Sequence, residues 1–98
     1  MLLDYIDNYK SIIETINEYK KINNKDIRLI VVSKTQDYTK IIELEKLGQR
    51  DFGENYLDEA REKIRQINNP SIIWHYIGLI QSNKIQKISE NFSWIHTV

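Results

Sequence analysis

The residue with the clearest chemical potential is a lysine that follows an apolar strand. Residues 28–33 contain four consecutive apolar side chains, mostly β-branched, and Lys34 comes next. In parallel α/β folds the active site lies at the carboxyl ends of the strands. An ammonium on an apolar face loses hydration, which favours the neutral, nucleophilic amine that forms Schiff bases. The alternative is a lysine that only starts a surface loop, and position alone favours this alternative.

Other chemistries that depend on small motifs find little support. The sequence has no cysteine and only three glycines, Gly48, Gly53 and Gly78, so thiolate sites and glycine-rich phosphate loops are excluded. His75 and His96 are the only histidines, and each lies inside a strand pattern. A packed or hydrogen-bonded histidine is favoured over a metal ligand at both positions, because zinc sites need three or four converging ligands.

Composition indicates an ordinary globular protein rather than a binder of polyanions. The 98 residues are 41% hydrophobic and 29% charged, and the 14 basic and 14 acidic side chains give a formal net charge of zero. This balance argues against a nucleic-acid or anionic-membrane partner. The first residues lack a signal-peptide pattern, and no apolar run approaches the ~20 residues that span a bilayer. The expected location is therefore the cytoplasm.

Hydrophobic spacing predicts alternating helices and strands that would position the lysine. We expect helices over residues 2–19, 37–47, 56–67 and 82–90, and strands over 28–33, 51–55, 72–77 and 94–98. Asp37 and Ser82 are expected to cap the second and fourth helices, and Gly48 to end the second. Ile85 and Ile88 should face the core. Alternation of this kind predicts right-handed βαβ units around a parallel sheet.

The predicted strands differ in character. The apolar run over residues 28–33 predicts a strand buried on both faces, whereas the short segment 51–55 reads as a weak strand. Four parallel strands can begin an open doubly wound sheet or form half of an eight-stranded barrel. Periodicity does not choose between the two.

Three blocks of residues carry a family resemblance. They are Val32-Ser33-Lys34-Thr35, then residues 48–56 (GQRDFGENY), then residues 74–84 (WHYIGLIQSNK). Together with His96-Thr97 they resemble the pyridoxal phosphate homeostasis protein family, which is itself similar to the N-terminal barrel domain of alanine racemase. The resemblance implies that residues 1–98 are a partial pyridoxal-phosphate-binding (β/α) barrel domain. This would be the N-terminal half of a (β/α)₈ TIM-type barrel, with about four parallel strands and an extra N-terminal helix.

The resemblance also implies a site and a role. Lys34 matches the lysine that holds pyridoxal phosphate as a Schiff base, and Asn55 matches a residue near the cofactor. His75 and Gly78 belong to the third block. From the residues alone, Asn55 could equally be a turn residue that starts a helix, and His75 could face the barrel interior or pack. Gly78 should allow a close backbone turn. The family is non-catalytic and is linked to vitamin B6 homeostasis.

Two departures from the family pattern bear on these expectations. Asp37 stands where the family commonly has proline, and the second half of the barrel has no counterpart in this sequence. We therefore expect that the chain as written is not a stable monomer: either it is a fragment or degraded gene product, or it self-associates through open sheet edges. Two alternatives stay open: a truncated remnant or scaffold without cofactor function, and a fragment of an alanine-racemase-type enzyme, which would need a second base and a second domain.

Overall fold

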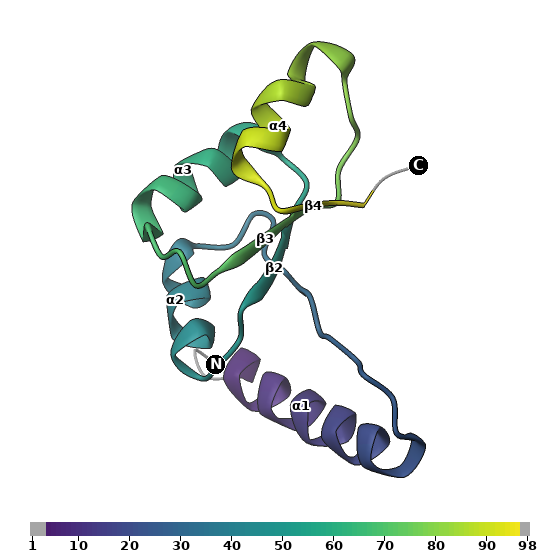
Figure 1. Ribbon diagram of the computed structural model, residues 1–98. Coiled ribbons are helices and arrows are strands. Elements are labelled where there is room, and N and C mark those ends of the chain that lie inside the picture. The colour runs from purple at the N-terminus through teal and green to yellow at the C-terminus, as the bar shows by residue number, and fades with distance from the viewer. Residues whose placement is uncertain (1–3, 97–98) are drawn as a thin grey trace.

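The computed structural model describes residues 4–96, which alternate between helices and strands (Figure 1). The elements are α1 (Asp4–Asn23), β1 (Val31–Val32), α2 (Tyr38–Lys46), β2 (Asp51–Glu54), α3 (Leu57–Ile67), β3 (Ile73–Tyr76), the 3₁₀ helix η1 (Ser82–Lys84), α4 (Ile85–Asn91) and β4 (Trp94–Ile95). The order agrees with the predicted alternation. Residues 2–3 of the first predicted helix and 97–98 of the last predicted strand lie outside the described residues.

The four strands form one parallel sheet whose order follows the chain, β1-β2-β3-β4. Val31 is in register with Phe52, and Phe52 with Trp74. His75 is in register with Trp94. The predicted α/β class with about four parallel strands and an additional N-terminal helix is confirmed.

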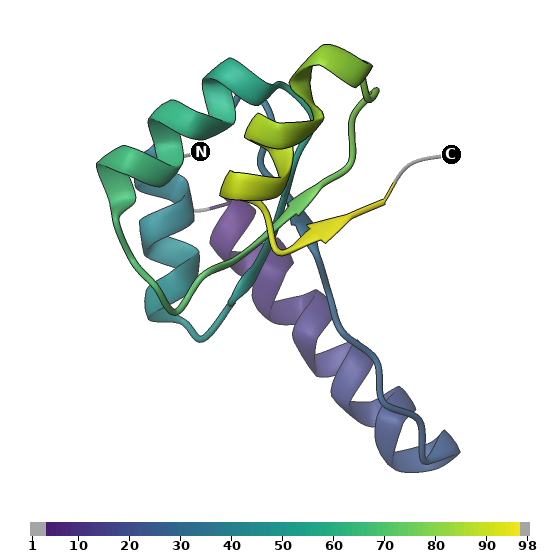
Figure 2. The same ribbon diagram turned by 45° about the horizontal axis from the view of Figure 1, so that its top comes forward.

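Helices α2, α3 and α4 cover one face of this sheet (Figure 2). Successive strand residues point to opposite faces, so Phe52, Trp74 and Tyr76 share the covered face. Phe52 is fully buried there. The helices contribute the other half of this core through Ile41, Leu44, Leu57, Ala60, Ile88 and Phe92. Burial of this apolar surface is the main force that holds the helices to the sheet.

Helices α2, α3 and α4 leave the opposite face of the sheet uncovered (Figure 2), and we call this face the open face. It carries Val32, Gly53, His75 and Trp94, which share one register level across the four strands. Val32 is 50% exposed and Trp94 51% exposed, whereas His75 is buried. The open face therefore presents apolar side chains to solvent on both edge strands.

Helix α1 packs at the end of the sheet where the strands begin, and its later turns project from the body (Figure 1). Tyr9 is buried, and its hydroxyl donates to Gln49 Oε1 at 2.9 Å. Gln49 Nε2 donates in turn to the carbonyl oxygen of Leu29 at 2.7 Å. Burial raises the pKa of the Tyr9 phenol above its ordinary value. The contact is local, because Ile12 and Ile22 further along α1 are exposed.

The ends of α2 agree with the sequence prediction. Asp37 lies in an extended conformation at the N-cap, and its side chain accepts a hydrogen bond from the Thr39 N–H at 3.2 Å. Gly48 follows the last turn with φ +108°, a conformation that favours glycine. Asp37 thus supplies the helix start that the sequence predicts.

Several other expectations were wrong. Only Val31 and Val32 of the predicted strand 28–33 form a strand, and the half-exposed Val32 contradicts burial on both faces. The reason is that β1 is an edge strand. Ser82 does not cap a helix: it begins the 3₁₀ turn η1, and Gln81 before it makes no side-chain cap. Ile88 is buried as expected, whereas Ile85, at the start of α4, is 49% exposed.

The described residues can be judged for membrane-spanning helices and for metal sites. None of the helices within residues 4–96 combines the length and the apolar character needed to cross a membrane. Over the same residues, no group of three or more His, Cys, Asp or Glu side chains is placed to hold a metal ion.

Candidate functional site

The predicted site residues gather where the strands end. Lys34 follows β1 by two positions, Asn55 follows β2 directly, and Gly78 follows β3 by two. Lys34 lies in a turn and is exposed, and among the described side chains its ammonium has no hydrogen-bond or ion-pair partner. The expected burial of Lys34 on an apolar face is therefore not found. Within residues 4–96, helices α2, α3 and α4 leave the open face beside Lys34 uncovered.

The backbone around Lys34 is held on both sides. Ser33 is buried, and its N–H donates to the carbonyl oxygen of Gly53 at 2.9 Å, which extends the pairing of β1 with β2. Thr35 has φ +60°, a left-handed conformation that is unusual for a β-branched residue. Its hydroxyl donates to the carbonyl oxygen of Lys34 at 2.6 Å. A constrained loop thus presents an exposed amine.

A buried charge cluster lies behind this loop. Lys63 of α3 is 8% exposed at its side chain, and its ammonium lies 2.9 Å from Glu54 Oε2 and 2.6 Å from Glu59 Oε2. Glu54 is fully buried and accepts a hydrogen bond from the Ser33 hydroxyl. The Lys63 ammonium also donates to the Ser33 carbonyl oxygen at 2.5 Å. The cluster connects α3 and β2 to the residue that precedes Lys34.

Asn55 and Gly78 meet directly. A Cβ atom on Gly78 would lie 2.4 Å from the carbonyl oxygen of Asn55, so only glycine fits here. Asn55 Oδ1 is buried and has no hydrogen-bond partner among the described residues. Asn55 does not cap α3, whose N-cap is Tyr56. The alternative role as a helix-starting residue is thereby excluded, and its side-chain oxygen is an unused acceptor.

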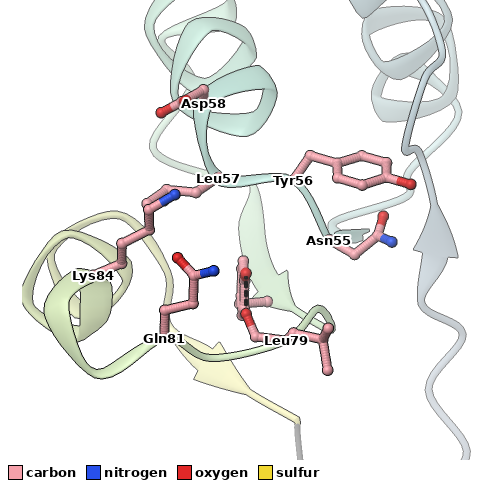
Figure 3. Close-up of a pocket in the computed structure, with 8 residues that line it drawn as sticks. Asn55, Tyr56, Leu57, Asp58, Leu79, Gln81 and Lys84 are labelled. Carbon is pink, nitrogen blue, oxygen red and sulfur yellow. Dashed lines mark hydrogen bonds between the residues drawn. The ribbon is translucent and has the colours of Figure 1, made fainter.

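A pocket of about 480 Å³ opens beside these residues, at the ends of β2 and β3. Asn55 and Tyr56 line one side, and Gln81 and Lys84 line the other (Figure 3). The Tyr76 hydroxyl donates to the carbonyl oxygen of Leu79 at 2.7 Å, and both residues line the pocket (Figure 3). Burial raises the pKa of the Tyr76 phenol. Its lining is mixed, with amide and charged side chains beside apolar and aromatic ones.

His75 lies in a hydrogen-bonded chain on the open face. Its Nε2 is 2.8 Å from Asp51 Oδ1, and its Nδ1 is 2.8 Å from His96 Nε2. Because a carboxylate only accepts, Nε2 carries the hydrogen shared with Asp51. Arg28 also pairs with Asp51. Both ring nitrogens of His75 are thus hydrogen-bonded, and His96, at one end of this series of hydrogen bonds, is exposed to solvent.

The sequence predicted where the strands end but not the charged side chains that pair beside these strand ends. Asp51, Glu54 and Lys63 did not stand out, because a single polar residue in a strand or helix carries no periodic signal. One cue was available: Glu59 and Lys63 have the i, i+4 spacing of a helical ion pair. The cue for His96 was its place in the final family block.

Four parallel strands in chain order, with helices on one face and a lysine at the end of the first strand, define a partial parallel (β/α) barrel. No protein-family model matches the chain. Individual curated proteins do: the pyridoxal phosphate homeostasis protein of Buchnera aphidicola subsp. Baizongia pistaciae is 46% identical over 93 residues, which span 95% of this chain and 41% of that protein. The Escherichia coli (strain K12) protein of the same name is 43% identical over 77 residues, 76% of this chain and 33% of that protein.

Solved structures give the same result. The structure of PipY from Synechococcus elongatus with pyridoxal phosphate (PLP) bound matches with a TM-score of 0.68 and 35% identity, over 84% of this chain and 41% of that chain. The resemblance to the N-terminal part of the pyridoxal phosphate homeostasis protein family is thereby confirmed, as is the fold of half a barrel. The chain spans 41% of the length of the Buchnera protein, 33% of the Escherichia coli protein and 41% of the PipY chain.

Proposed function

We propose that residues 1–98 form a partial PLP-binding barrel domain that takes part in intracellular PLP (vitamin B6) homeostasis without catalytic turnover. The cofactor would be held as a Schiff base on Lys34. The observation that carries this proposal is an exposed lysine at the carboxyl end of β1, on a constrained loop, in a chain similar to a protein whose structure contains PLP. The relatives are named as homeostasis proteins rather than enzymes.

The residues present fit such a cofactor. The Lys34 amine would attack the aldehyde carbon, a C=N bond would form and one water would leave, with no oxidant or reductant required. Asn55 Oδ1, buried without a partner, would accept a hydrogen bond at the edge of the ring. Gly78 lets its backbone approach that of Asn55 closely. His75 would affect the cofactor only indirectly, through its hydrogen bond to His96.

Affinity for the cofactor should be low in this chain alone. In barrels of this type, phosphate is usually bound by backbone N–H groups near the seventh and eighth strands. Each charge-assisted hydrogen bond contributes roughly 1.5–3 kcal/mol, so the loss of several removes orders of magnitude in affinity.

We further propose a cytoplasmic location, in keeping with the sequence-based expectation.

The test is to trap the Schiff base and locate it. The chain is incubated with PLP and reduced with borohydride, and the pyridoxyl adducts are mapped by mass spectrometry. We expect labelling of Lys34 about tenfold above that of the exposed Lys10 and Lys87, because a positioned amine reacts faster than a free one. The Lys34→Arg variant should lose the selective adduct and retain only the background.

Other outcomes would support the alternatives. Equal labelling of Lys34, Lys10 and Lys87 would favour a remnant or scaffold without cofactor function. Racemisation of an amino acid by the PLP-treated chain would favour the enzyme fragment and contradict the non-catalytic role.

We also propose that the chain self-associates through its open sheet edges. Edge strands β1 and β4 expose backbone groups together with Val32, Trp94 and Ile95, the last of which is 39% exposed. Unpaired edges of this kind promote pairing with another chain. The open face adds apolar surface that a second copy would cover.

Sedimentation velocity checks this expectation. The chain should sediment as dimers or larger species at micromolar concentration, and Ile95→Lys on the β4 edge should shift it towards monomer. The matched control is Ile22→Lys, which places the same charge on the 81% exposed Ile22 of α1 and should leave the distribution unchanged. A compact, cooperatively unfolding monomer would contradict the proposal.

A further inference from the structure

We propose that Glu59 and Lys63, which we call the α3 clamp, are positioning residues that fix the backbone of Lys34 and so set the direction from which its amine meets an aldehyde. Both residues lie on α3, 25 and more positions from Lys34 in the sequence. The inference rests on the proposed Schiff-base function and adds to it a support that lies outside the site.

The first contact holds the peptide group that precedes Lys34. The Lys63 ammonium donates to the Ser33 carbonyl oxygen at 2.5 Å, and the Gln36 N–H donates to the same oxygen at 3.1 Å. Lys63 is buried, so its ammonium has few alternative partners and stays at this carbonyl. The Ser33 hydroxyl is held from the other side by Glu54.

The second contact holds the peptide group that follows Lys34. The Thr35 N–H donates to Glu59 Oε2 at 2.7 Å. This residue has φ +60°, and a β-branched side chain keeps such a conformation only where its surroundings impose it. The carboxylate of Glu59 supplies that constraint, because it accepts the N–H in this conformation.

The two contacts are joined within the clamp itself. The Lys63 ammonium lies 2.6 Å from Glu59 Oε2, one helical turn along α3, and 2.9 Å from Glu54 Oε2 on β2. Both peptide groups that flank Lys34 are therefore anchored to a single ion pair. The Cα–Cβ direction of Lys34 is fixed, while its own side chain stays exposed and free to react.

One test needs no cofactor. Amide hydrogen exchange of Thr35, followed by NMR in the full chain, should be slow in the wild type and faster by about tenfold or more in Glu59→Ala, since that variant removes the acceptor. Glu59→Gln keeps a carbonyl oxygen at this position and should retain most of the protection. Unchanged exchange at Thr35 in a folded Glu59→Ala chain would overturn the clamp.

The second test measures the chemistry with pyridoxal, which lacks the phosphate and so removes phosphate affinity from the comparison. After borohydride reduction, Glu59→Ala should lower the labelling of Lys34 relative to Lys87 about tenfold, because misplacement of a reacting group costs rate. Thr35→Gly in the same chain should restore at least half of the preference, since glycine adopts φ +60° without strain. Because glycine at this position also relieves backbone strain, circular dichroism under the labelling conditions gives the folded fraction of each variant and separates this loss from one caused only by lower stability.

The outcomes separate the clamp from the proposed function. Selective labelling of Lys34 in the wild type and equal selectivity in Glu59→Ala would overturn the clamp and leave the Schiff-base proposal standing. No selectivity in the wild type would overturn the Schiff-base proposal, and Thr35 exchange would then decide whether the clamp holds the backbone. If circular dichroism shows that Glu59→Ala is unfolded, Glu59→Met takes its place: it fills a similar volume but offers no acceptor to the Thr35 N–H, and unchanged Thr35 exchange and Lys34 labelling would overturn the clamp.

Discussion

Lys63→Met is expected to lower the free energy of unfolding by about 3–5 kcal/mol, because it leaves buried carboxylates without their counter-charge. Lys63 is 8% exposed at its side chain, and its partner Glu54 is fully buried. Methionine fills a similar volume but supplies no charge and no donor for the Ser33 carbonyl oxygen. Urea unfolding followed by circular dichroism measures the loss, and a domain of this size has little stability in reserve.

Two further variants identify the cause. In the Lys63→Met chain, Glu54→Gln removes the unpaired charge and keeps an acceptor for the Ser33 hydroxyl, so it should recover more than half of the lost stability. Arg65→Met removes the exposed ion pair with Glu62 on the same helix and should cost little stability, because solvent screens an exposed pair. A loss for Lys63→Met no larger than that for Arg65→Met would refute the buried-charge explanation.

Gly78→Ala is expected to destabilise the chain by about 1–3 kcal/mol, since it introduces a methyl group into closely packed backbone. The added Cβ would lie 2.4 Å from the carbonyl oxygen and 2.9 Å from the Cα of Asn55. Backbone atoms cannot rotate away as a side chain can, so the segment after β2 or the segment after β3 must move. Thermal unfolding gives the loss of stability, and the amide chemical shift of Asn55 reports the movement.

Gly53→Ala is the matched comparison on the open face. There the added Cβ would lie 3.2 Å from Ile30 Cγ2 and from Ile77 Cδ1, which are side-chain methyl groups rather than backbone atoms. Small shifts of these side chains relieve the contact, so we expect a smaller loss than for Gly78→Ala. The reverse ranking would contradict the backbone clash.

The helices, and their alternation with strands along the chain, were predicted well because both depend on local patterns. Residues 57–67 form α3 with Leu57 and Ala60 buried, as their spacing predicts. The cap at Asp37 and the turn at Gly48 follow from the conformations that these two residue types favour. The half-barrel arrangement needed the family resemblance in addition, since periodicity fits an open sheet equally well.

Burial of the strands was predicted poorly because it depends on distant partners. The segment Asp51–Glu54 looks too polar for a central strand, yet every residue in it is buried. Asp51 is paired with Arg28 and His75, and Glu54 is paired with Lys63, so their charges are offset by side chains that only the fold brings near. No short-range pattern contains that information.

The site shows the same division. The position of Lys34 at a strand end follows from the apolar run before it, and Gly78 was expected to permit a close backbone approach. The left-handed Thr35 and the orphaned Asn55 oxygen were not foreseen, because each results from contacts between segments more than 20 residues apart.

The order of strands in the sheet has a consequence for how the chain folds. Each strand pairs with the strand just before it in the sequence, and register partners lie about 20 residues apart. Short loops of similar length close with a similar and modest entropic cost, and contacts between sequence neighbours favour fast folding. The sheet can therefore grow strand by strand during synthesis, each new βα unit adding to an edge already formed, as domains fold while the ribosome releases them.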